Sequence, residues 1–187
     1  NPMMKWIIIH VVVIAALMAG LFALTKMPKT NAANTDTVIY LVRHAEKVTG
    51  ENAGRDPALT SQGKARALVL AEVLRKESIA RVHSSNYIRT KDTGAPLAKN
   101  LGVNIEIYNP GDLSGIAETL KAAKGTHLVV GHSNTIPETV EALGGDGGTP
   151  IYEKSEYDRL YVVTITEDGK VSTKLRRYGV RYKPDTE

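Results

Sequence analysis

The stretch "TVIYLVRHAEK", residues 37–47, joins an apolar run directly to a cluster of charged and polar groups. Residues 38–41 are apolar or aromatic and predict a buried strand, and Arg43, His44 and Glu46 follow at once. Ligands of open parallel sheets bind beyond the carboxyl ends of the strands. The stretch therefore predicts a core strand that carries a cation, an imidazole and a carboxylate to a binding edge.

Short apolar runs alternate with helical patterns along the rest of the chain. We predict strands at 37–43, 79–85, 103–108 and 127–133, and helices at 59–78, 86–102, 111–125 and 134–145. Residues 157–179 predict two more strands with a turn at Asp168 and Gly169. This order predicts an α/β fold, a three-layer sandwich with a mainly parallel sheet and an antiparallel edge.

Residues 6–24 form an apolar segment of 19 residues with no formal charge. As a helix this segment would extend about 28 Å, close to the roughly 30 Å hydrocarbon core of a bilayer. Its length favours an uncleaved membrane anchor over a signal peptide cleaved near residues 30–34. We therefore predict contact with the lipid bilayer through residues 6–24.

The same segment sets the predicted domain organisation. Residues 1–26 are the anchor or signal segment, 27–36 a polar linker, and 37–187 the folded α/β domain. A short tail before a first apolar segment usually stays in the cytoplasm. We expect the domain outside the cytoplasm, in the periplasm of a Gram-negative cell, or secreted if the segment is cleaved.

Charge and cysteine content exclude several functions. Lysine and arginine total 24 against 20 acidic residues, but three of the lysines lie before residue 30. The remaining 21 against 20 make the domain nearly neutral, so the sequence does not predict nucleic-acid binding. The chain has no cysteine, which excludes disulfides and thiolate metal sites.

Four basic side chains are predicted to converge at one edge of the sheet. Arg43 and His44 end the first strand, His132 ends the fourth, and Arg89 lies in the first turn of the helix after the second. Guanidinium groups bind phosphate oxygens bidentately, and an imidazole can attack phosphorus. The set suits a phosphate monoester.

Four blocks carry a family resemblance: "LVRHAE", "DPALTSQGKARA", "SSNYIRTKDTGAPLA" and "VVGHSNT". In this order they resemble the histidine phosphatase superfamily, the phosphoglycerate mutase-like proteins, in its compact phosphatase branch. The resemblance implies that His44 is the nucleophile and forms a phosphohistidine. It also implies that Arg43, Arg89 and His132 hold the phosphoryl group, without a metal or other cofactor.

The general acid is less clearly marked. Ser133 stands where phytase-like members of the superfamily carry an aspartate. Mutase-like members place a glutamate in a region where this chain offers Glu106, Asp112 and Glu118, for which cap or surface roles compete. We take Glu46, close to the nucleophile, as the candidate general acid.

These inferences predict a metal-independent phosphomonoester hydrolase. Only residues 90–131 lie between the second arginine and the second histidine, which leaves little room for the insertions of mutases. The expected substrate is a small phosphorylated molecule such as a sugar phosphate or an envelope glycan phosphate. A protein phosphohistidine phosphatase and a non-catalytic phosphate-binding module of the same fold are the alternatives.

Overall fold

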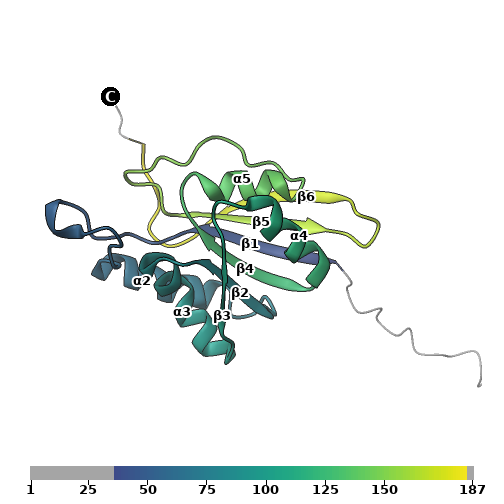
Figure 1. The fold of residues 1–187 in the computed structure, drawn as a ribbon, viewed down its shortest axis with the longest axis horizontal. Helices are drawn as coiled ribbons and strands as arrows, with labels where there is room; N and C mark the ends of the chain where they lie inside the picture. Colours follow the sequence, from purple (N-terminus) through teal and green to yellow (C-terminus); the bar gives the residue numbers. More distant parts are fainter. Residues whose placement is uncertain (1–35, 185–187) are drawn as a thin grey trace, which may run out of the picture. The chain divides into compact units, whose positions relative to one another are not determined.

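A six-stranded mixed sheet forms the centre of the domain in the computed structural model, which describes residues 36–184 (Figure 1). The strands are β1 (Thr37–Arg43), β2 (Arg81–Ser85), β3 (Ile105–Tyr108), β4 (Thr126–Gly131), β5 (Arg159–Ile165) and β6 (Val171–Arg177). Their order across the sheet is β3-β2-β4-β1-β5-β6. The predicted α/β fold is confirmed.

The sheet divides into a parallel and an antiparallel part. Strands β3, β2, β4 and β1 are parallel, whereas β5 runs antiparallel to β1 and β6 antiparallel to β5. The antiparallel part is the predicted pair of strands, joined by a turn in which Gly169 has a φ of 83°. The parallel part brings the carboxyl ends of four strands to one edge.

The helices lie between successive strands from β1 to β5. They are η1 (Glu51–Ala53), α2 (Ser61–Val73), α3 (Ile88–Leu101), α4 (Leu113–Ala123) and α5 (Thr135–Ala142). The side chains of Thr60 and Asp112 cap α2 and α4 by accepting from backbone N–H groups three residues on. Gly102 ends α3 in the left-handed conformation, which glycine adopts more readily than other residues.

Two apolar cores lie on opposite faces of the sheet. Alternate residues of β1 point to each side, as a strand buried on both faces requires. Ile39 and Leu41 pack in the core that includes α4 and α5, and Tyr40 and Val42 in the core that includes α2 and α3. Figure 1 shows these helix pairs on either side of the sheet.

Helix α3 contains two residues that commonly interrupt helices. Gly94 and Pro96 both lie inside it, and the helix continues through them. Gly94 is buried against the sheet, where an added Cβ would lie 3.2 Å from the side chain of Val82. Burial of this helix face offsets the hydrogen bond that proline removes.

Two histidines away from the predicted site have structural roles. His83 and His127 are buried, with Nε2 of His83 3.1 Å from Nδ1 of His127. Nε2 of His127 lies 2.6 Å from the carbonyl oxygen of Lys124, which can only accept. His127 therefore donates to that carbonyl and accepts from His83, and the pair links β2 to β4.

Within residues 36–184, no helix combines the length and apolar character needed to cross a bilayer. The predicted membrane segment, residues 6–24, and nearly all of the linker lie outside the described residues.

Candidate active site

The strand register brings the "LVRHAE" block of β1 and the "VVGHSNT" block of β4 together. Arg43 of β1 lies opposite Gly131 of β4, and the N–H of His44 donates to the carbonyl of Gly131 at 2.8 Å. His44 directly follows Arg43, and His132 directly follows Gly131. The centroids of the two imidazole rings are 5.7 Å apart. Parallel pairing of β1 and β4 is therefore what places the two imidazoles side by side.

Backbone contact fixes the tautomer of His44. Its Nδ1 lies 2.7 Å from the carbonyl oxygen of Ala45, so Nδ1 carries the proton and Nε2 keeps its lone pair. Burial, followed by the nearby charges of Arg43 and Arg89, lowers the pKa of His44 to about 3. The ring is neutral at physiological pH and has one nitrogen available as a nucleophile.

A chain of hydroxyl groups orients His132. Nε2 of His132 lies 2.9 Å from Oγ of Ser85, and Ser85 donates to Oγ1 of Thr90. The hydroxyl of Thr90 itself donates to backbone carbonyls, so Ser85 accepts from His132. Nε2 thus carries a proton, and burial lowers the pKa of the ring to about 4.

Arg43 lies behind the nucleophile, with a side chain that is only 2% exposed. Its two terminal nitrogens donate to loop carbonyls, at 2.6 Å to Glu153 and 3.0 Å to Glu156. Its guanidinium carbon lies 4.0 Å from the ring centre of Tyr157. Nε is buried without a hydrogen-bond partner among the described residues, which leaves a donor for a ligand.

Arg89 is held from two sides at the start of α3. Its NH1 lies 3.4 Å from a carboxylate oxygen of Asp56, and its guanidinium stands over the ring of Tyr87. The same carboxylate accepts from the N–H of Ile88 at 3.0 Å. As in Arg43, Nε of Arg89 is buried and finds no acceptor within residues 36–184.

A cavity of about 650 Å³ opens at this edge of the sheet. His44, Arg89 and His132 line it, together with Lys47 and Glu153 from two loops. Of the sequence-predicted residues, the structure thus brings these three to one cavity. Arg43 supports it from behind, close enough for its charge to lower the pKa of both histidines.

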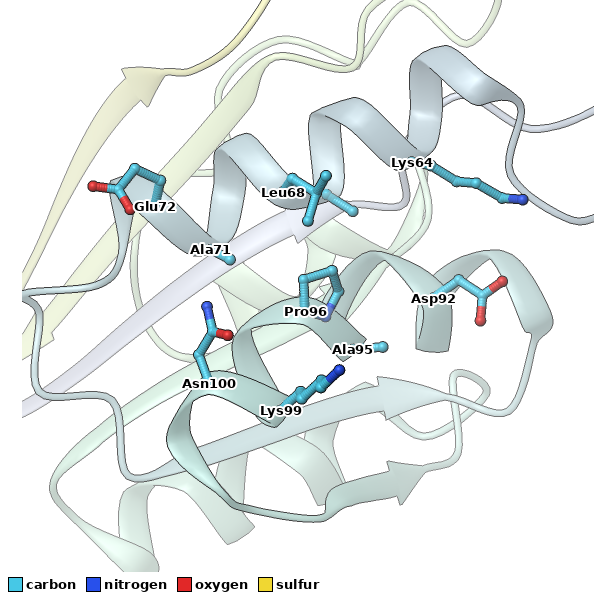
Figure 2. A pocket seen from close by; sticks show the side chains of 10 residues that line it. Lys64, Leu68, Ala71, Glu72, Asp92, Ala95, Pro96, Lys99 and Asn100 are labelled. Carbon is cyan, nitrogen blue, oxygen red and sulfur yellow. The ribbon is translucent and has the colours of Figure 1, made fainter.

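A larger hollow of about 790 Å³ lies between α2 and α3 (Figure 2). Leu68 and Pro96 are among the residues that line it, and its cations are Lys64 and Lys99. The same lining includes the carboxylates of Glu72 and Asp92. Histidine and arginine are absent from this lining. Its chemistry offers neither a nucleophile nor a guanidinium fork, so we place the active site in the smaller cavity.

Glu46, the predicted general acid, is engaged elsewhere. Both of its carboxylate oxygens accept from Arg66, at 2.8 to 3.0 Å, and it is not among the residues that line the cavity. Arg66 also donates to the carbonyls of Tyr178 and Val180. The structure does not place Glu46 at the cavity: Arg66 joins α2 to the C-terminal segment, and Glu46 pairs with Arg66 because a buried guanidinium requires a paired charge.

Replacing Glu46 with glutamine should therefore reduce stability and leave catalysis intact. The side chains of Arg66 and Glu46 are only 5% and 14% exposed, so loss of one charge leaves the other uncompensated. We expect the free energy of unfolding in urea to fall by about 2 to 3 kcal/mol. The kcat of the folded variant should stay within about twofold of wild type, and a loss of a hundredfold would restore the acid role.

Sequence reasoning missed several residues of the site. Ser85 contacts His132, Asp56 contacts Arg89, and Tyr87 lines the cavity. All three lie inside the quoted sequence blocks, and this position was a signal that could have identified them. Glu153 and Tyr157 lie in the long loop before β5, where no motif or periodicity marks them. Only the three-dimensional path of that loop reveals their place.

The fold and this edge define an α/β domain that presents paired imidazoles and guanidinium groups to an anion. Residues 39–109 match the model of the histidine phosphatase superfamily (branch 1). The matched range contains His44 and Arg89. The predicted resemblance to that superfamily is confirmed, and the match supports a hydrolase of the phosphatase class. A search of curated protein sequences finds no match.

Solved structures share the fold at low sequence identity. One is the protein histidine phosphatase SixA in complex with tungstate, with 20% identity and a TM-score of 0.58, covering 75% of this chain and 95% of that chain. Another is a mycobacterial glucosyl-3-phosphoglycerate phosphatase, with 13% identity and a TM-score of 0.59, covering 76% of this chain and 98% of the other.

Proposed function

We propose that this chain is a phosphomonoester hydrolase that acts through a phosphohistidine on His44. The observation that carries this proposal is the unprotonated Nε2 of His44 in the same cavity as Arg89, whose buried Nε–H has no acceptor within residues 36–184. A phosphoryl group supplies both the electrophilic phosphorus and the missing acceptor oxygens. The cavity therefore has the components of a phosphoryl-transfer site.

The steps of hydrolysis follow from these groups. Nε2 of His44 forms a bond to phosphorus as the bond to the leaving oxygen breaks. The charges of Arg43 and Arg89 offset the negative charge on the transferred oxygens. Water then attacks the phosphohistidine, the N–P bond breaks, and inorganic phosphate leaves with the ring neutral again.

Hydrolysis of p-nitrophenyl phosphate by the full-length chain tests this proposal. Arginine and lysine side chains supply the cationic charge, so we propose that no metal is needed. Turnover should proceed in EDTA at the rate seen without it. A protein that binds phosphate without turnover would instead be the non-catalytic module, and a rate that EDTA abolishes would overturn metal independence.

A protein phosphohistidine phosphatase is the second candidate. The structural similarity to SixA favours it, and the same cavity could accept phosphorus from an N–P bond as readily as from an O–P bond. A peptide that carries phosphohistidine, compared with sugar phosphates at equal concentration, discriminates the two functions. The substrate with the higher kcat/KM identifies the class.

The membrane location is part of the proposal. Residues 6–24 are long and apolar enough for an anchor, and this supports a tethered or exported phosphatase acting on a small phosphorylated envelope molecule. Protease treatment of intact spheroplasts should digest the domain if it faces outward. Protection of the domain would place it in the cytoplasm and favour the phosphohistidine substrate.

A further inference from the structure

Glu153 provides the one carboxylate among the residues described as lining the active-site cavity. It lies in the loop between α5 and β5, at the same opening as His44, Arg89 and His132. Within residues 36–184, its carboxylate forms no hydrogen bond or ion pair with another side chain or with the backbone. It is therefore free to meet a bound substrate.

Three carboxylates outside the cavity lining are bound to protein groups. Glu46 binds Arg66, Asp56 binds Arg89 and the start of α3, and Asp112 caps α4. Each would have to give up a structural bond to donate a proton to a ligand. Glu153 would give up none.

The backbone of Glu153 is held firmly although its side chain is free. NH2 of Arg43 donates to its carbonyl oxygen at 2.6 Å, and NH1 donates to the carbonyl of Glu156 at 3.0 Å. The carboxylate of Glu156 in turn accepts from the N–H of Tyr152 and from Arg159. The residue that supports the nucleophile thus also fixes the loop that carries Glu153.

We propose that Glu153 is the general acid that protonates the leaving group and then accepts a proton from the attacking water. As the bond between Nε2 of His44 and phosphorus forms, the bond to the leaving oxygen breaks, and that oxygen takes the proton of the Glu153 carboxyl group. In the second step the carboxylate takes a proton from water as the N–P bond breaks. This assignment rests on the phosphatase function proposed above.

The test compares leaving groups in the full-length chain. p-Nitrophenolate leaves without a proton, whereas an alkoxide needs one, so we measure p-nitrophenyl phosphate against glycerol phosphate. In Glu153→Gln, kcat for glycerol phosphate should fall by about a hundredfold, and kcat for p-nitrophenyl phosphate by less than about threefold. Glu118→Gln, on the exposed side of α4, is the matched control and should leave both rates unchanged.

The remaining outcomes overturn the assignment. Equal losses on both substrates would mean that Glu153 only maintains the structure of the loop, and no loss on either would mean that another group donates the proton. A wild-type chain that hydrolyses only the aryl phosphate would show that no proton donor operates. Failure of the wild-type chain on both substrates would instead refute the phosphatase function itself.

Discussion

Replacing His44 with alanine is expected to lower kcat for phosphomonoester hydrolysis by about 10³-fold or more. The variant removes the only proposed nucleophile, and the phosphohistidine can no longer form. Steady-state hydrolysis of p-nitrophenyl phosphate measures the first effect. Rapid quenching with labelled substrate measures the second, since acid-labile phosphate should be recovered on the wild-type chain and be absent from the variant.

The loss of kcat in His44→Ala must be distinguished from an effect of unfolding, because the His44 side chain is only 3% exposed. His44→Asn fills more of the same space and offers no nucleophilic ring nitrogen, so it should be as inactive as alanine while retaining more stability. Urea unfolding of both variants provides the comparison. Rates equal to wild type in either folded variant would exclude His44 as the nucleophile.

The arrangement of strands was predictable because it depends on local pattern. Apolar runs that end in "RH" and "GH" mark strands buried on both faces, and the turn chemistry of Thr60, Gly102 and Asp112 marks the helix ends. Parallel strands bring their carboxyl ends to one edge of a sheet, so the convergence of His44 and His132 on that edge was predictable. Their direct contact depends on the pairing of β1 with β4, which the sequence did not predict.

The pairing of charged side chains was not predictable in the same way. Glu46 follows the proposed nucleophile by two residues in the sequence. Its carboxylate is nevertheless paired with Arg66, in the second turn of α2. Nothing in the pattern of either segment shows that they meet. Arg43 was expected to hold the phosphoryl group, and its donation to the carbonyls of Glu153 and Glu156 depends on a loop more than a hundred residues away.

Replacing Arg89 with alanine is expected to lower kcat/KM by about 10² to 10³-fold. Its guanidinium lines the cavity, and its Nε–H has no partner in the part of the chain that the structure describes, so it is positioned to bind the transferred phosphoryl oxygens. Arg89→Lys retains the charge and loses the planar fork, and should recover less than a tenth of the lost rate. Affinity for inorganic phosphate, measured by calorimetry, should weaken in both variants.

Arg75→Ala is the matched control, because Arg75 is an exposed arginine whose partner, Glu72, is one turn away on the surface of α2. It should change neither kcat/KM nor phosphate affinity. Asp56→Asn should give an intermediate loss, since Asp56 holds Arg89 and does not line the cavity. A full rescue by lysine would show that charge alone suffices and would contradict the role of the guanidinium fork, whereas wild-type rates in Arg89→Ala would remove this residue from the site.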